Sequence, residues 1–162
     1  TPCAVTVGAE VYFGGQRMRI IRGAHRGVII NDTTVSVGQS IKSVGAGVKG
    51  YFKAAARNAL AQASDRYADT LGVSYANLVL RDTRSRWGSC SSQRQLMYSW
   101  RLIMAPPAIL EYVAAHEVSH LVEMNHSPAF WDIVESIYPN YKSARQWLRS
   151  NGTSLHRYDF DA

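Results

Sequence analysis

The chain has 162 residues, of which 46% are hydrophobic and 19% charged, a composition that excludes a disordered chain and suits one folded domain. Its net charge of +6 comes from 14 Arg and 4 Lys against 12 acidic residues, without any block of about five or six like charges. No run of about 18 apolar residues occurs, so we expect no membrane span, and the first residues do not resemble a signal peptide.

The N-terminal quarter has the pattern of β-strands. The expected strands are residues 10–13, 16–21, 28–30 and 33–37. Gly14-Gly15 separates the first two and permits the positive φ that a tight hairpin turn needs, and we make the same argument for Asn31-Asp32 between the other two. The sequence therefore predicts a β-rich portion, residues 1–44, that contains two hairpins.

The apolar period changes near Val44 to that of a helix. Apolar residues recur every three or four positions from Val48 to Leu71, which predicts a helix over about residues 47–71 that ends near Gly72. The many alanines on this helix suit close packing against another element.

The second half of the chain predicts strands and then helices. Residues 78–80 are a short apolar run, and residues 84–90 and 96–104 flank a polar segment, which predicts one strand and a longer hairpin. Pro106-Pro107 ends the last strand and can begin a helix, because proline is tolerated in the first helical turn. The expected helices are residues 108–124, from Ser127-Pro128 to about 137, and from Asn140 to about 151. We therefore predict one α+β domain over residues 1–162.

Residues 116–120 read His-Glu-Val-Ser-His within the strongest helical pattern of the chain. Two histidines four positions apart on a helix lie about 40° apart in projection, so both imidazoles can bind one metal ion. The carboxylate of Glu117 can reach a water molecule at an open metal position, as in HExxH metallohydrolases. The motif predicts a metal site with His116 and His120 as ligands.

A zinc ion that keeps one position for water needs a third protein ligand, and His126 is our first candidate. On a continuing helix His126 would lie about 9 Å along the axis from His120 and on another face, so the chain must turn before it. We expect that turn after Leu121, with Asn125 in the left-handed region. The alternative third ligands are Glu135 and Glu123.

Four motifs occur in order along the second half of the chain. They are Arg86-Trp87-Gly88-Ser89-Cys90, Trp100-Arg101-Leu102 with Ala105-Pro106, His116-Glu117-x-x-His120, and Asn125-His126-Ser127-Pro128-x-Phe130-Trp131. Together they resemble the YgjP-like family of metallopeptidases, which is related to the SprT-type zincins. The match is dense from about residue 81 to 148, with one departure at Ser99, where relatives are expected to carry Asn.

The resemblance implies a zincin core over residues 45–162, in which a long helix backs a short sheet and precedes the metal helix. It implies His116, His120 and His126 as metal ligands and Glu117 as general base. The fold class that we predict is thus a small α+β zincin-like domain with N-terminal β-hairpins and C-terminal helices.

The Arg-Trp-Gly-Ser-Cys segment has two interpretations. In a strand, Arg86, Gly88 and Cys90 face one side and Trp87 the other, and Gly88 permits close approach of a backbone or ligand. An edge strand could pair with an extended substrate, with Arg84 and Arg86 as binding residues. Alternatively, Trp87 belongs to the core and Arg86 packs against an acidic helix residue. We expect Cys90 to be a small buried residue.

The sequence offers several candidates for the other groups around the metal. Residues able to stabilise an oxyanion are Tyr98, Tyr138, Tyr141, Arg84 and Arg86. Carboxylates that could support a ligand histidine are Glu135 and Asp132, although we favour solvated acids. The aromatic residues expected in the core are Trp100, Phe130, Trp131 and Trp147. The histidines expected to be surface or structural residues are His25 and His156.

We predict a zinc-dependent metallohydrolase, a peptidase in first place, with one Zn²⁺ per chain and other divalent metals as alternatives. A second hypothesis is a metal-dependent nucleoside triphosphate pyrophosphatase, an activity to which the resembling family has been linked. The arginines could clamp phosphates, although no Gly-rich phosphate loop occurs. A third is a nucleic-acid-associated protease-like module, which the charge permits but no basic–aromatic stripe supports.

We expect a peptide or protein substrate, a nucleotide as the alternative, and neither a membrane nor a nucleic acid as partner. Cys3 and Cys90 have no CxxC spacing, so they predict neither a disulfide framework nor a cysteine-based zinc site. Two such thiols favour a reducing, cytoplasmic location.

Overall fold

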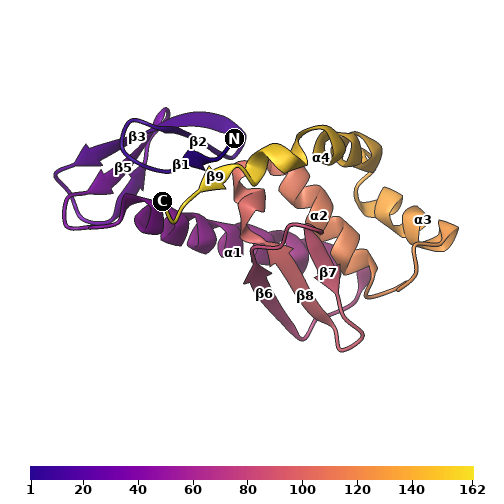
Figure 1. Ribbon diagram of the computed structural model, residues 1–162. Coiled ribbons are helices and arrows are strands. Elements are labelled where there is room, and N and C mark those ends of the chain that lie inside the picture. The colour runs from indigo at the N-terminus through magenta and orange to yellow at the C-terminus, as the bar shows by residue number, and fades with distance from the viewer.

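A four-stranded sheet packs on the first turns of a long helix in the computed structural model, which describes residues 1–162 (Figure 1). Its strands are β2 (Glu10–Phe13), β3 (Gln16–Gly23), β4 (Val28–Ile30) and β5 (Thr34–Gly38), in the order β2-β3-β5-β4. The helix α1 (Val44–Leu71) continues beyond this sheet into the second half of the molecule. The α+β class is confirmed.

The two predicted hairpins are present, but only one uses the expected turn. Gly14 and Gly15 have φ of 58° and 77° between β2 and β3, as predicted. Asn31 and Asp32 do not have positive φ, so that part of the prediction was wrong. The second turn is closed instead by the Asn31 N–H, which donates to the Thr34 carbonyl at 2.9 Å, and by a side-chain bond between the same residues.

Both ends of α1 are capped by residues with a clear physical role. The Ser43 hydroxyl accepts a hydrogen bond from the Ala46 N–H at 3.3 Å, so the helix begins at Val44, three residues before the predicted start. Gly72 ends the helix with φ of 68°, as predicted, because the left-handed region favours glycine.

A second sheet has three strands, β6 (Asn77–Arg81), β7 (Gly88–Cys90) and β8 (Gln95–Ser99), in the order β6-β8-β7. The strand β8 is central, parallel to β6 and antiparallel to β7, which leaves β7 at an edge. The predicted hairpin arms were too long. The second arm ends at Ser99, whose hydroxyl accepts from the Arg101 N–H and starts a 3-10 helix, η1 (Trp100–Met104).

Three helices complete the chain: α2 (Pro107–Ser119), α3 (Pro128–Ile137) and α4 (Tyr141–Leu155). α2 ends five residues before the predicted Met124, and α4 extends beyond the predicted residue 151. After α4 the chain returns to its beginning, where β9 (Tyr158–Asp159) pairs in parallel with β1 (Cys3–Ala4) (Figure 1). None of the helices combines the length and apolar composition that a membrane span requires.

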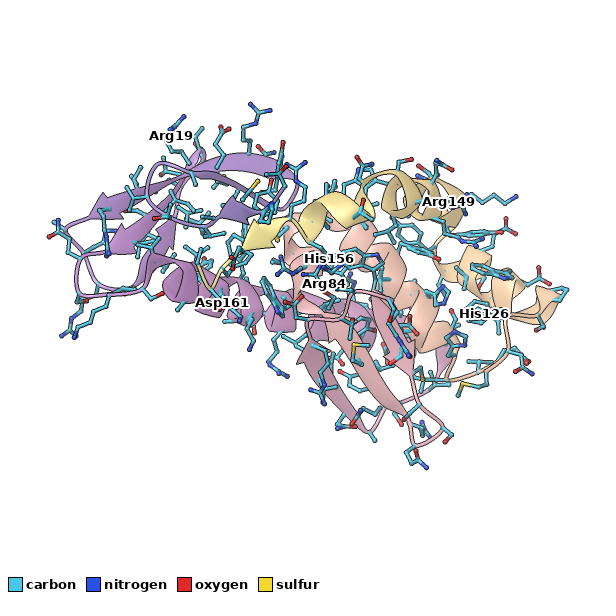
Figure 2. All side chains as sticks on the ribbon, in the orientation of Figure 1. Arg19, Arg84, His126, Arg149, His156 and Asp161 are labelled. Atoms are coloured by element: carbon cyan, nitrogen blue, oxygen red, sulfur yellow. The ribbon has the colours of Figure 1, made fainter.

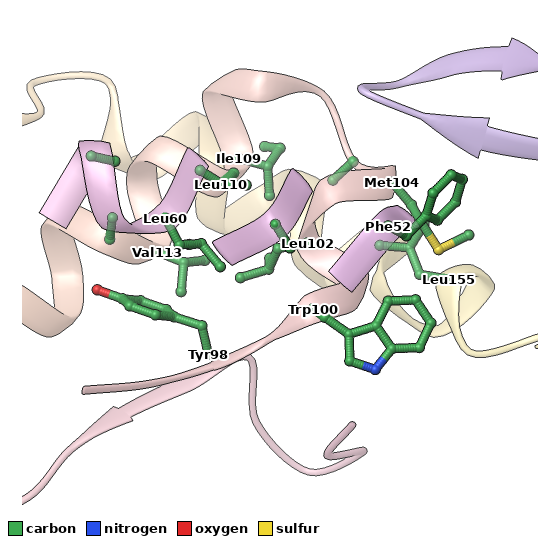
Figure 3. Packing of buried hydrophobic residues seen from close by; sticks show 14 of the residues in the cluster. Phe52, Leu60, Tyr98, Trp100, Leu102, Met104, Ile109, Leu110, Val113 and Leu155 are labelled. Carbon is green, nitrogen blue, oxygen red and sulfur yellow. The ribbon is translucent and has the colours of Figure 1, made fainter. Parts of the chain in front are cut away.

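One hydrophobic core of 31 buried residues connects α1, β8, η1 and the C-terminal helices (Figure 3). Phe52 and Leu60 of α1 are fully buried in it, and the other labelled members are Tyr98, Trp100, Leu102, Met104, Ile109, Leu110, Val113 and Leu155. This core holds α2, and with it the His-Glu-x-x-His motif, against α1 and the second sheet.

Candidate metal and catalytic site

Three imidazoles converge where α2 ends and α3 begins. His116 lies on the last turn of α2, His120 caps that helix, and His126 lies on the chain that leads to α3 (Figure 2). The His126 Nε2 lies 3.1 Å from the His120 Nε2 and 3.2 Å from the His116 Nε2, and the ligand atoms all lie within 4.8 Å of one another. A tetrahedral zinc site separates two nitrogen ligands by about 3.3 Å, so the donor set fits a zinc ion.

The chain reaches His126 by a tight helix end rather than by the predicted turn. Leu121 and Val122 donate their N–H groups to carbonyls three residues back, at 2.9 and 3.0 Å, which tightens the last turn after Ser119. Asn125 does not have a positive φ, so the left-handed turn expected there was wrong. The predicted start of α3 is present, because the Ser127 hydroxyl accepts from the Phe130 N–H.

The outer nitrogens of two imidazoles have partners in the protein. His120 Nδ1 lies 3.2 Å from the Glu123 carbonyl, an acceptor, so Nδ1 carries the proton and the Nε2 lone pair faces the other histidines. The Tyr112 hydroxyl lies 3.1 Å from His116 Nδ1. Sequence reasoning missed Tyr112, although its position four residues before His116 places it on the same helix face.

The acids that the sequence offered as alternatives do not join the cluster. Glu135 and Asp132 are exposed on α3 and make no hydrogen bond to a histidine, and Glu123 contributes its carbonyl rather than its carboxylate. The cluster of potential ligands contains the three histidines alone. The assignment of these histidines as metal ligands stays a prediction.

Burial disfavours the charged form of His116 and His120. Desolvation, with smaller contributions from His120, His126 and Arg145, lowers the pKa of His116 to about 3, and burial also lowers the pKa of His120. A neutral imidazole offers the lone pair that a metal ion needs. The electrostatics of the site therefore match a cation-binding role.

Glu117 is a buried carboxylate without a hydrogen bond to the protein. It is 6% exposed, and burial raises its pKa to about 8 against an opposing effect of the Arg86 charge. A Cβ at Gly88 would lie 2.9 Å from the Glu117 Cγ, so glycine makes this approach possible. In addition to burial, the Glu117 charge contributes to the raised pKa of Cys90, which lies on the same edge strand as Gly88.

A cavity of about 300 Å³ opens beside these groups. Its lining residues are Trp87, Gly88, Tyr112, Val113, His116, Glu117, His126 and Leu148. A larger cavity of about 520 Å³ lies elsewhere, lined by Arg84 and His156 among others (Figure 2). We place the site at the smaller cavity because two of the convergent imidazoles, His116 and His126, line it, whereas Arg101 and Asp82 in the larger one already pair with each other.

The residues offered for oxyanion stabilisation lie outside this cavity. Tyr98 is fully buried and bonds the Ser64 hydroxyl at 2.9 Å, and the Tyr138 hydroxyl donates to the Ala108 carbonyl at 2.7 Å. Tyr141 stacks on Trp131 with ring centroids 5.3 Å apart. Arg86 remains near Glu117, and its role in substrate binding stays a prediction.

The remaining aromatic and cysteine residues mostly agree with expectation. Trp100 and Phe130 are buried, whereas Trp131 and Trp147 are only partly buried against the core. Cys90 is partly buried, and burial raises the pKa of its thiol to about 11, which keeps it protonated.

Comparisons with known proteins bear on this geometry. The family model described as YgjP-like, metallopeptidase domain, matches residues 4–151 of the chain. The crystal structure of the metallopeptidase zymogen of Pyrococcus abyssi abylysin is similar in fold, with a TM-score of 0.51 and 21% sequence identity. The likeness covers 61% of this chain and 97% of that one. No curated protein matches the chain.

Proposed function

This chain belongs to the YgjP-like metallopeptidase family, and from that membership we propose that it is a zinc-dependent peptidase with Glu117 as general base. The observation that carries the proposal is a buried carboxylate, free of protein hydrogen bonds, on the helical turn that also carries two of three convergent imidazoles. A structural glutamate buried to this extent would be paired with a hydrogen-bond donor. An unpaired carboxylate beside three histidines that could hold a metal ion is typical of a catalytic site.

We propose His116, His120 and His126 as the residues that hold the zinc ion, one ion per chain. Three protein ligands leave a position open, which distinguishes a catalytic zinc site from a structural one. When bound, the ion would act as a Lewis acid toward the substrate carbonyl and a water molecule. The lowered pKa values of His116 and His120, the convergence of the three Nε2 atoms and the fixed His120 tautomer support this assignment.

In the proposed reaction Glu117 moves the proton. Its carboxylate accepts a proton from the water that attacks the carbonyl carbon, and then delivers that proton to the amine nitrogen as the peptide bond breaks. Burial raises its pKa, so the carboxylate is a stronger base than an exposed glutamate. The substrate would lie extended along the free edge of β7, which borders the cavity at Gly88.

Replacement of Glu117 by Gln tests the proposal, because the change removes the proton acceptor and leaves every proposed ligand in place. We expect Glu117→Gln to keep about one zinc per chain by elemental analysis and to lose at least about 100-fold in kcat/KM on unstructured peptides. His126→Ala should lose both the metal and the activity. Glu135→Gln, a change at an exposed acid on α3, is the matched control and should lose neither.

Two outcomes would refute the proposal. Substantial peptide cleavage by metal-loaded Glu117→Gln would exclude this residue as the base. Turnover of a nucleoside triphosphate by the wild-type protein, with no cleavage of any peptide in the panel, would favour the pyrophosphatase hypothesis instead.

A further inference from the structure

The proposed catalytic cavity has an apolar wall whose position is fixed by neighbouring residues. The Trp87 ring stacks on the His156 ring with centroids 5.0 Å apart. Gly152 of α4 lies so close to Trp87 that a Cβ at position 152 would be 3.2 Å from the Trp87 indole. Leu148 of the same helix lines the cavity beside Trp87. An indole held in this way presents a preformed apolar surface to a ligand.

A second cavity of about 330 Å³ continues from this wall. It shares Trp87, Tyr112 and Leu148 with the catalytic cavity, so the two adjoin. Its other lining residues are Arg145 and Arg149. The combined cleft therefore runs from Glu117 and the imidazoles, past an apolar wall, to two arginines of α4.

The two arginines have charges that no acidic side chain neutralises. Arg145 and Arg149 are exposed, form no ion pair, and lie one helical turn apart on α4. Figure 2 shows Arg149 in the same half of the molecule as His126. The Arg145 guanidinium carbon lies 4.4 Å from the Trp131 ring centroid, and Arg149 is 3.4 Å from the Gln146 side-chain oxygen. The only acid that lines either cavity is Glu117.

We infer that the preferred substrate is a peptide with an apolar side chain that packs on Trp87 and Leu148 and, next to it, a carboxylate that binds Arg145 and Arg149. Guanidinium groups bind carboxylates through paired hydrogen bonds, and α4 presents two of them at the end of the cleft. The carboxylate is that of an Asp or Glu side chain or that of the peptide's C-terminus. This inference rests on the proposed peptidase function.

The test compares peptides that differ in one group. Two C-terminally amidated peptides carry Leu followed by either Glu or Gln, and a third carries Leu-Gln with a free C-terminal carboxylate. We expect kcat/KM to be roughly three- to tenfold higher for a peptide with the carboxylate than for the amidated Gln peptide, because exposed ion pairs contribute modestly. The preference should decrease as salt is added.

Charge variants then identify the residues responsible. Arg145→Gln and Arg149→Gln should each move the ratio of kcat/KM values toward one. Arg145→Glu should instead favour a fourth, amidated peptide in which Lys follows Leu over the Leu-Glu peptide. Arg26→Gln removes the same charge at an exposed position between β3 and β4, where the side chain forms no hydrogen bond or ion pair, and should keep the wild-type ratio. Thermal melts check that each variant is folded.

Peptide affinity measured with zinc-loaded Glu117→Gln, by fluorescence anisotropy, separates this inference from the proposed function. Tighter binding of the carboxylate peptides, weakened by Arg145→Gln, supports the inference even if the wild-type protein cleaves none of them. Cleavage and binding of all three peptides with equal efficiency, or a preference that Arg145→Gln and Arg149→Gln both leave intact, would overturn the inference and leave the peptidase proposal standing.

Discussion

At residue 88 the backbone passes so close to Glu117 that a hydrogen atom is all the side chain the position accepts. A Cβ there would lie 2.9 Å from the Glu117 Cγ and 3.0 Å from both the Glu117 Oε2 and the Met97 carbonyl oxygen. The carbonyl belongs to the backbone of the central strand β8 and cannot move aside. Any relief of the clash must therefore displace Glu117, the residue on which the proposed chemistry depends.

We expect Gly88→Ala to lower kcat/KM by roughly 100-fold, because a shift of about 1 Å in a catalytic group has an effect of that size. It should destabilise the fold by about 1–3 kcal/mol, as overpacking does. Steady-state kinetics and urea denaturation measure the two effects.

Gly50→Ala is the control for this substitution. Gly50 is exposed on α1, and a methyl group there would have no atom within 4 Å, so alanine should stabilise the helix by about 0.5–1 kcal/mol and leave kcat/KM unchanged. Equal activity of Gly88→Ala and the wild type would show that Glu117 does not need its present position.

The elements around the cluster position the third imidazole. His120 ends α2 and His126 precedes α3, so the start of α3 determines where His126 lies. Ser127 caps that helix, and the Phe130 ring, one turn later, stacks on the His120 ring with centroids 4.3 Å apart. The cap therefore anchors both the loop and the wall behind the histidines.

Loss of this cap should weaken the metal site more than it weakens the fold. We expect Ser127→Ala to lower the free energy of unfolding by about 1 kcal/mol and to lower zinc affinity by roughly tenfold, because a residue next to a ligand supports its orientation. Competition with a zinc chelator measures the affinity.

Ser43→Ala provides the matched comparison. Ser43 caps α1 in the same way as Ser127 caps α3, because its hydroxyl accepts from a backbone N–H at the same 3.3 Å, but Ser43 is not adjacent to any of the three clustered histidines. Its loss should reduce stability by a similar amount and leave zinc affinity unchanged. If both variants lose the same affinity, the cap acts through global stability alone.

At the scale of the whole molecule, Arg101 connects distant parts of the chain. This buried residue of η1 donates to the Leu155 and Tyr158 carbonyls at 2.9 and 3.0 Å and forms an ion pair with Asp82 at 2.7 Å. It thereby holds the end of α4 and β9 to the segment that follows β6. Its removal would leave several buried acceptors without a donor.

The Asp82–Arg101 pair makes stability depend on pH in a definite direction. Partial burial raises the pKa of Asp82, but the hydrogen bonds and charge of Arg101 outweigh this and leave it below its ordinary value. A carboxyl with a lowered folded-state pKa stabilises the fold above its unfolded pKa of about 3.9, and that contribution is lost as the pH falls through the folded pKa.

We therefore expect Asp82→Asn to reduce the free energy of unfolding by about 1 kcal/mol at pH 7, a modest value because the Asp82 side chain is 41% exposed and solvent screens the pair. Denaturation at pH 7 and pH 3 should show the difference from wild type shrinking at the lower pH. Asp161→Asn, which disrupts the exposed Lys49–Asp161 pair, should change stability by less than about 0.5 kcal/mol at either pH. A difference for Asp82→Asn that grows on acidification would contradict the stabilising role of the ionised carboxylate.

The sequence by itself determined the features that depend on neighbours along the chain. The period of α1 and its end at Gly72, the Gly14-Gly15 hairpin and the start of α3 at Ser127 all follow from local backbone preferences. The spacing of His116 and His120 on one helix face is also a local feature that the sequence determined. The order of the four motifs further identified the family to which the chain belongs.

Only the tertiary structure decided which distant residues meet. The position of β8 between β6 and β7, the pairing of β1 with β9 and the approach of Gly88 to Glu117 join segments tens of residues apart. The place of Arg145 in the cleft is of the same kind. Such pairings depend on packing around one shared core, which buries apolar area without regard to sequence distance, and no local period or motif encodes that choice.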